Sequence, residues 1–220
     1  MQGIGDKFEE LYKGKPDPWS VKKAVSEKFR LDRLFGMINF QNYNSILDLG
    51  CGEGVFTSKL TKLGDKITCV DISSTAIERA KHSVDSRGKQ VRFLCADINN
   101  LNVLDAENKF DLICCLETLY YLEKSDREKL LDGIEMLLRE NGFILFSAPV
   151  IGKSYYTLDE LKESIGAKFD IYMLRILTIR FHGRIVPKIF HGFMYSIGLF
   201  LAKYIKKLRY QVGILAVKKQ

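Results

Sequence analysis

LDLGCGEG, residues 47–54, joins a short apolar run to a stretch with helical spacing. Its glycines, Gly50, Gly52 and Gly54, allow a tight turn at the end of a strand and a close approach of the backbone to a ligand. Asp71 ends the next apolar run, 21 residues after Gly50, where a carboxylate can accept hydrogen bonds from both hydroxyls of a ribose. The combination predicts a nucleoside-binding turn between a strand and a helix.

The spacing differs from that of a dinucleotide-binding loop. The GxGxxG pattern is replaced by GxGxG, and Asp48 precedes the first glycine by two residues. A pyrophosphate needs the positive end of a helix without a carboxylate beside it, whereas Asp48 suits a ligand that carries an ammonium group. S-adenosylmethionine has such a group together with a ribose and an adenine. The loop therefore favours this ligand over a dinucleotide.

Short apolar runs alternate with helical stretches on both sides of the loop, which is typical of βα units and a mostly parallel sheet. Strands are expected at 45–50, 66–71, 91–96, 110–116 and 142–148, with further apolar runs at 169–179 and 212–219. Helices are expected at about 19–35, 53–63, 74–86, 125–139 and 157–165. The pair Asp17–Pro18 is expected to open the first of these, and capping boxes at Ser125 and Thr157 to open the last two. The chain is thus predicted to have an α/β, doubly wound fold.

Two segments lie outside this alternation. Residues 1–40 are expected to form an N-terminal helical cap on the main domain, residues 41–220. A basic amphipathic helix is expected as an insertion at about 185–209, with an apolar stripe and a cationic face between 188 and 209. Three interpretations of this helix stay open: packing on the domain, covering of the substrate, and peripheral contact with an anionic membrane.

Composition excludes several classes of protein. A chain of 220 residues with 46% hydrophobic and 28% charged residues suits one globular domain, not a disordered, collagen-like or coiled-coil protein. The five cysteines are odd in number and show no CxxC spacing, so neither a disulfide framework nor a zinc site is predicted. With no signal peptide or membrane-spanning run expected, the predicted location is cytoplasmic.

The net charge of +7 is unevenly distributed. No Asp or Glu follows Asp170, and ten Lys and Arg residues give the last 50 residues a charge of +10, which leaves −3 for the first 170. Such a tail either contacts an anionic partner or is covered by the acidic body of the domain. Nucleic acid is not expected as the partner, because the cationic residues form one helical face and an NPPY motif is absent.

The sequence resembles the class I S-adenosylmethionine-dependent methyltransferases from about Asp17 to the final strand. Their first motif, DxGxGxG, is matched from Asp48 to Gly54. The resemblance implies a Rossmann-like seven-stranded sheet, mostly parallel with an antiparallel last strand, and S-adenosyl-L-methionine as cofactor without a metal. It assigns the ribose to Asp71 and the adenine amino group to Asp97. In full, it implies cofactor contacts for Asp48, Gly50, Cys51, Gly52, Asp71, Ile72, Ala96, Asp97, Ile98 and Leu116.

Within this family, two short stretches resemble the nodulation-type methyltransferases that N-methylate an amino sugar of a chitin oligosaccharide. They are DPW at 17–19 and ETLYYL at 117–122, although Leu116, Thr118 and the long basic helix depart from that pattern. The implied acceptor is a small molecule, with a sugar amine as first choice and a hydroxyl as second. Two alternatives stay open: an O-methyltransferase of a lipid or quinone at the membrane surface, and a non-catalytic S-adenosylmethionine-binding module.

Four residues are candidates for the acceptor end of the site. Glu117 follows the fourth expected strand, at the edge where doubly wound sheets bind ligands, and with Tyr121 is the candidate for catalysis. Tyr120 and Trp19 are candidates for substrate contact, by stacking on a ring or closing the site. Each has a plainer explanation, since Glu117 can cap a helix and the aromatic residues can simply pack.

Overall fold

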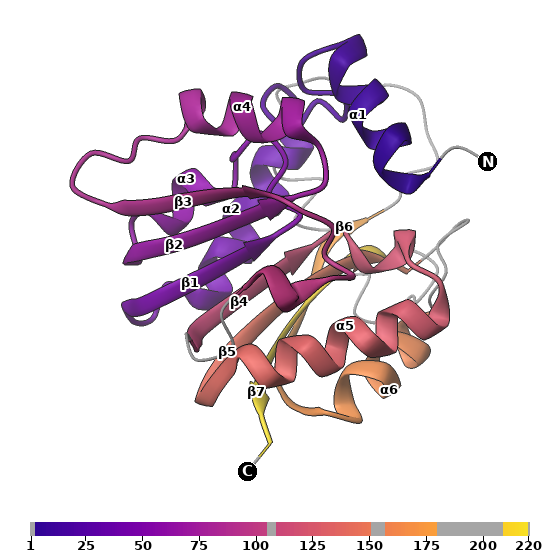
Figure 1. The fold of residues 1–220 in the computed structure, drawn as a ribbon. Helices are drawn as coiled ribbons and strands as arrows, with labels where there is room; N and C mark the ends of the chain where they lie inside the picture. The colour runs from indigo at the N-terminus through magenta and orange to yellow at the C-terminus, as the bar shows by residue number, and fades with distance from the viewer. Residues whose placement is uncertain (1–2, 105–108, 151–156, 180–208, 220) are drawn as a thin grey trace.

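The computed structural model describes residues 3–104, 109–150, 157–179 and 209–219, and within them seven strands form one sheet (Figure 1). The strand order is β3-β2-β1-β4-β5-β7-β6. Strands β1 to β5 are parallel, and β7 pairs antiparallel with both β5 and β6. The expected Rossmann-like sheet with an antiparallel last strand is confirmed. The bounds are β1 Tyr43–Leu49, β2 Gly64–Asp71, β3 Gln90–Cys95, β4 Phe110–Leu116, β5 Leu138–Pro149, β6 Phe169–Ile179 and β7 Arg209–Lys218.

Helices cover both faces of the sheet (Figure 1). One face carries α2 (Val25–Ile38), α3 (Thr57–Leu60) and α4 (Ser74–Ser83), and the other carries α5 (Lys124–Leu137) and α6 (Leu158–Gly166). Two short 3-10 helices, η1 (Leu101–Val103) and η2 (Leu119–Tyr121), flank β4 in the chain. Helix α1 (Ile4–Gly14) lies beyond the edge of the sheet toward which the parallel strands point.

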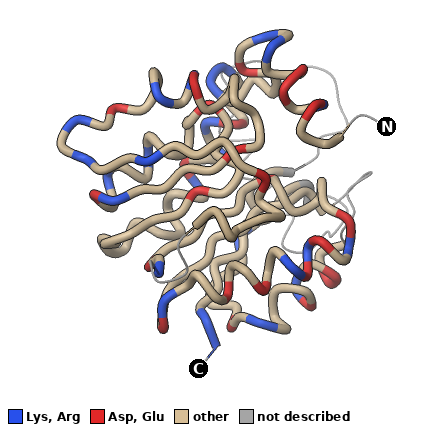
Figure 2. The backbone as a smooth tube through the Cα atoms, in the orientation of Figure 1, with Lys and Arg blue, Asp and Glu red and all other residues tan. Residues whose placement is uncertain are grey.

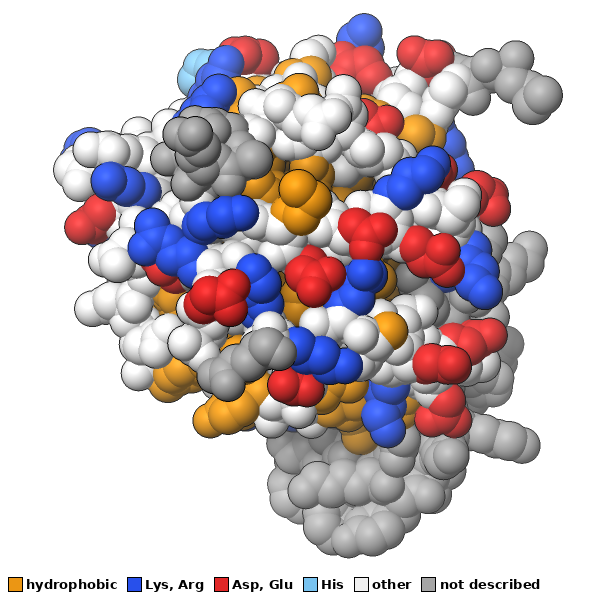
Figure 3. All heavy atoms as spheres, turned by 60° about the horizontal axis from the view of Figure 1, so that its bottom comes forward, with side chains coloured by type: hydrophobic (Ala, Val, Ile, Leu, Met, Phe, Trp, Pro, Cys, Tyr) orange, Lys and Arg blue, Asp and Glu red, His pale blue; other side chains and the backbone are white. Residues whose placement is uncertain are grey.

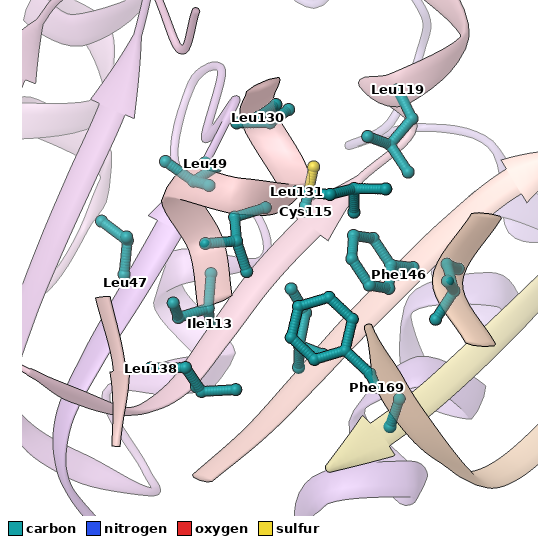
Figure 4. Packing of buried hydrophobic residues seen from close by; sticks show 14 of the residues in the cluster. Leu47, Leu49, Ile113, Cys115, Leu119, Leu130, Leu131, Leu138, Phe146 and Phe169 are labelled. Carbon is teal, nitrogen blue, oxygen red and sulfur yellow. The ribbon is translucent and has the colours of Figure 1, made fainter. Parts of the chain in front are cut away.

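Alternating residues of the strands build a separate apolar core on each face. Leu47 and Leu49 of β1 pack toward the α5 side, in the cluster that contains Phe146 and Phe169 (Figure 4). Ile46 belongs to the cluster on the α2 side. Because side chains alternate across a strand, a strand buried on both faces reads as one continuous apolar run. This explains why the central strands are easily recognised in the sequence.

The N-terminal region differs from the expectation. Helix α1 was not predicted, and the helix expected at 19–35 is α2, which begins at Val25. Asp17 has a φ of 50°, and its carboxylate accepts hydrogen bonds from the N–H groups of Val21 (2.6 Å) and Lys22 (3.0 Å). The Asp-Pro pair therefore stabilises a turn instead of opening a helix.

The boundaries of two other expected helices, at 53–63 and 125–139, were also wrong. Of the helix expected at 53–63 only α3 is helical, because the chain turns at Gly54 with a φ of 77°. Helix α5 has Glu123 as its N-cap, so the Ser125 side chain does not cap it, and β5 starts directly after its last residue. The capping box at Thr157 is confirmed, with the Glu160 N–H 3.2 Å from the Thr157 hydroxyl.

The basic amphipathic helix expected at 185–209 lies outside the described residues, apart from Arg209, the first residue of β7. Among the helices that the model does describe, none is long and apolar enough to cross a membrane. Both signs of charge alternate along α5 and over the face shown in Figure 3 (Figures 2 and 3). The positive excess of the chain comes from the residues after Asp170.

Candidate functional site

A cavity of about 400 Å³ lies at the carboxyl ends of β1, β2 and β4, between these strands, α1 and α2. This size falls within the usual range for small-molecule sites. Ala96 is the one predicted site residue that does not line it; its backbone N–H donates to the carbonyl of Asp71 (2.9 Å). The cavity brings together the other predicted residues: Trp19, Asp48, Gly50, Cys51, Gly52, Asp71, Ile72, Asp97, Ile98, Leu116, Glu117, Tyr120 and Tyr121.

The loop after β1 has glycine where the cavity leaves no room for a side chain. Gly50 and Gly52 have φ values of 73° and 54°, a region that favours glycine. A Cβ at Gly50 would lie 2.6 Å from the Thr118 hydroxyl, and one at Gly52 would lie 2.7 Å from the Tyr12 hydroxyl. The loop therefore presents bare backbone to the cavity.

Asp71 fixes this loop from the end of β2. Its Oδ2 accepts a hydrogen bond from the Gly52 N–H (2.8 Å), and its Oδ1 accepts one from the Ser73 N–H (3.0 Å). Burial raises the pKa of this carboxyl above its ordinary value, against the effect of these N–H groups. Because each carboxylate oxygen can accept two hydrogen bonds, both oxygens retain capacity for a ligand in the cavity.

Asp48 lies beneath the same loop, at the bottom of the cavity, and is almost entirely buried. Only 2% of its surface is exposed, and it accepts a hydrogen bond from the Thr57 hydroxyl (2.7 Å). In the neighbouring strands it pairs with Cys69 and Cys114, neither of which supplies a positive charge. Burial raises the pKa of Asp48 to about 6.

We expect Asp48→Asn to stabilise the ligand-free protein, and more so as the pH rises from about 4 to about 8. The pKa of Asp48 is about 6 in the fold against 3.8 normally, so the folded state binds the extra proton and wild-type stability falls through this window. At pH 8 the cost is about 3 kcal/mol, which an amide that still accepts the Thr57 hydrogen bond avoids. Calorimetric melting of both proteins across this pH range measures the difference in their stability. A difference that does not change with pH would contradict the prediction.

A second polar group surrounds Glu117, just after β4. Its φ of 56° is strained for a residue other than glycine, and such strain gathers at functional sites. Its Oε1 accepts from the Ser147 hydroxyl (2.9 Å), its Oε2 accepts from Gln211 Nε2 (3.1 Å), and Arg30 Nη1 lies 3.6 Å from Oε1. Burial raises the pKa of the Glu117 carboxyl, and Arg30 opposes this rise. The site thus holds a carboxylate with a raised affinity for protons.

Aromatic residues of α1 and the following turn close one side of the cavity. The Phe8 ring lies 4.9 Å from that of Tyr121 and 6.0 Å from that of Trp19, which lies 5.3 Å from Tyr12. The Tyr120 hydroxyl donates to the Tyr121 hydroxyl (3.2 Å). Burial raises the pKa values of Tyr12 and Tyr120, so both stay protonated at neutral pH.

Helix α1 is held in this position by Glu9. Its carboxylate accepts hydrogen bonds from the hydroxyls of Ser73 (2.6 Å) and Thr75 (2.7 Å) at the start of α4. These hydroxyls lower the pKa of Glu9 to about 2, so the carboxylate stays charged at neutral pH. The negative charge also suits the N-terminal end of α4.

Acidic side chains dominate the cavity wall. Glu53 is paired with Lys22 (2.6 Å) and Arg79 (3.0 Å). Burial acts to raise the pKa of Glu53, but the Asp17 N–H, Lys22 and Arg79 together bring it below the ordinary value. Because the wall is negative, it favours a cationic or neutral ligand. The lining residues hold one guanidinium, Arg30, and seven carboxyl groups: Asp17, Glu27, Asp48, Glu53, Asp71, Asp97 and Glu117.

Sequence reasoning missed several lining residues. Ile4, Phe8 and Tyr12 follow a four-residue spacing, so their periodicity was sufficient to indicate a helix with one face toward the site. Arg30 precedes Leu34 by four residues and so lies on the apolar face of α2. A cationic residue at such a position is expected to be buried. For Gln211 the local sequence gives no such signal, because β7 reaches the site only through its pairing with β5.

The comparisons with known proteins agree with the sequence motifs. A family model described as a methyltransferase domain matches residues 46–142. The chain is similar to nodulation protein S of Azorhizobium caulinodans, with 27% identity over 139 residues that cover 60% of this chain and 63% of that protein. It is also similar to a ubiquinone biosynthesis O-methyltransferase of Pasteurella multocida, with 31% identity over 153 residues, 64% of this chain and 62% of that protein. The matches thus span less than two thirds of these relatives.

One solved structure shares nearly the whole fold. It is N-methyltransferase NodS from Bradyrhizobium japonicum WM9 in complex with S-adenosyl-L-homocysteine, with a TM-score of 0.75 and 17% identity over 99% of this chain and 100% of that one. At this identity the likeness concerns the fold. Together with the family match, it confirms the resemblance to class I methyltransferases with a nodulation-type likeness.

Proposed function

We propose that this protein methylates an amine of a small acceptor, with a sugar amine as first choice, because residues 46–142 match a family model described as a methyltransferase domain and the fold is similar to that of an N-methyltransferase. The observation that carries the choice of an amine is the buried Glu117 carboxylate in a cavity whose lining holds seven carboxyl groups and one guanidinium. The relatives differ on this point, since one is named an N-methyltransferase and another an O-methyltransferase.

The cavity suits S-adenosyl-L-methionine as cofactor. Asp71 has acceptor capacity left for ribose hydroxyls, and Ile72 and Ile98 supply apolar neighbours for an adenine. The bare backbone at Gly52 lets a ligand approach closely where a Cβ would collide with the Tyr12 hydroxyl, and Asp48 adds negative charge beneath the loop. When bound, the cofactor supplies an electrophilic methyl group on a positively charged sulfur.

Charge favours an amine over an acidic hydroxyl as acceptor. An amine nitrogen becomes positively charged as it is methylated, and carboxylates nearby stabilise that charge. A phenol or catechol must instead lose a proton and become negative, which the same carboxylates oppose. The acidic lining thus lowers the barrier for the first reaction and raises it for the second.

We assign the catalytic role to Glu117, as the group that orients the amine and accepts its proton. Its raised pKa matches this role, because a base works best when its pKa approaches the working pH. Tyr121 is proposed to assist through its hydroxyl, and Tyr120 and Trp19 to contact the acceptor.

We further propose that residues 1–40 act as a cap that excludes water, as the ring contacts of Phe8 and Tyr12 support. The proposed location is the cytoplasm.

We expect methyl transfer to glucosamine or its short β-1,4 oligomers, measured as S-adenosylhomocysteine release, and none to 3,4-dihydroxybenzoate or a quinol. Each acceptor is assayed with and without anionic vesicles. Transfer to the quinol that depends on vesicles would replace the proposal with the membrane O-methyltransferase. S-adenosylhomocysteine binding without transfer to any acceptor, unaltered by Glu117→Ala or Tyr121→Phe, would favour a binding module.

A further inference from the structure

Arg30 is a buried cation with one nitrogen unused. Its side chain is 5% exposed, and its Nε and Nη2 bind Glu27 Oε2 at 2.9 and 2.8 Å. Its Nη1 makes no hydrogen bond within the part of the chain that the model describes, yet Arg30 lines the cavity. Leaving a buried charged donor without a partner is costly, so this nitrogen is suited to a ligand atom.

The unused nitrogen lies beside Glu117. Arg30 Nη1 and Glu117 Oε1 are 3.6 Å apart, which exceeds hydrogen-bonding distance. Ser147 and Gln211 already hold the two oxygens of Glu117 in place. The cavity therefore presents a hydrogen-bond acceptor, the Glu117 carboxylate, next to a hydrogen-bond donor, Arg30 Nη1, and both are held in place.

The charges around the pair decide which ligand fits. Glu27 neutralises Arg30, so a positively charged amine can approach Glu117 without net repulsion from the guanidinium. Tyr120 also interacts electrostatically with both Glu117 and Arg30. Burial keeps its hydroxyl protonated, so it adds no charge to the pair. An acidic ligand group would meet Glu27 and Glu117 along with the one guanidinium, so a neutral oxygen suits Arg30 better.

We propose that Arg30 is a specificity-determining residue, which binds a hydroxyl oxygen on the carbon next to the amine that Glu117 holds. The acceptor class is then a vicinal amino alcohol. Its amine donates to Glu117 and its hydroxyl accepts from Arg30 Nη1, so the two ligand atoms match the adjacent donor and acceptor. This inference rests on the proposed function and narrows its acceptor.

Calorimetric binding to the complex with S-adenosylhomocysteine tests this with two amines that differ in one hydroxyl, trans-2-aminocyclohexanol and cyclohexylamine. Wild type is expected to bind the amino alcohol at least about 10-fold more tightly, equivalent to about 1.4 kcal/mol. The double variant Glu27→Gln/Arg30→Met, which removes both members of the Arg30–Glu27 ion pair and leaves Glu117 hydrogen-bonded to Ser147 and Gln211, is expected to bind both amines equally. Arg30→Lys keeps the positive charge but loses the planar guanidinium. Its preference for the amino alcohol is expected to lie between those of wild type and the double variant.

The matched control is Glu78→Gln/Lys81→Met, which removes an exposed ion pair of the same three-residue spacing on α4. It is expected to keep the wild-type preference. No preference in wild type, or the full wild-type preference in Glu27→Gln/Arg30→Met, overturns the inference. A preference without methyl transfer in the release assay leaves the inference standing and rejects the proposed function instead.

Discussion

Asp71→Ala is expected to abolish the stabilisation that S-adenosylhomocysteine gives to the wild-type protein. A ligand at 100 times its Kd stabilises the folded state by about 2.7 kcal/mol, or about 5–10 °C in Tm for a chain of this size. Hydrogen bonds to a charged group contribute about 1.5–3 kcal/mol each, so the loss of two lowers affinity at least about 100-fold. A thermal-shift titration measures this, with NAD expected to give no shift in either protein.

Asp65→Ala is the matched control for this variant. Asp65 lies at the opposite end of β2, where it pairs with Lys89 on the surface. Its removal should leave the shift with S-adenosylhomocysteine intact. Because Asp71 also binds the N–H groups of Gly52 and Ser73, circular dichroism must show that Asp71→Ala is folded. A full shift in folded Asp71→Ala would reject the assignment of the ribose to this carboxylate.

Glu117→Gln is expected to lower kcat by about 100- to 1,000-fold while S-adenosylhomocysteine binding stays near wild type. The amide keeps the shape of the side chain but cannot accept a proton. Burial raises the pKa of Glu117, so the wild-type rate should fall as the pH decreases through that raised value. The variant should lose this limb of the pH–rate profile, which a purely structural role would leave unchanged.

Glu128→Gln on α5 is the control, because Glu128 is exposed and does not line the cavity. It should retain both the rate and the pH dependence. The assay uses the amine that wild type methylates fastest, with S-adenosylhomocysteine release as the readout. If Glu117→Gln retained the wild-type rate, Glu117 would be left with a structural role, and the strained φ of 56° would need another explanation.

Most of the cofactor end could be predicted from the sequence because its residues follow strands that are buried on both faces. Asp48, Gly50 and Asp71 stand at fixed places relative to continuous apolar runs, and parallel strands bring their carboxyl ends to one edge. The helices around them were harder to predict. Asp17 shows why, since one carboxylate can stabilise a turn as well as a helix, and only the path of the following chain decides between them.

The acceptor end was decided by tertiary structure. Glu117 was visible as the residue after a strand, but its partners come from α2 (Arg30), β5 (Ser147) and β7 (Gln211), separated along the chain by 87, 30 and 94 residues. Local propensity indicates a strand and the region in which it ends, since both depend on neighbours in the chain. Which cation stays buried beside a carboxylate, and which nitrogen it leaves free, depends on how distant elements pack. That packing decides whether the site recognises an amine alone or an amine with its neighbouring hydroxyl.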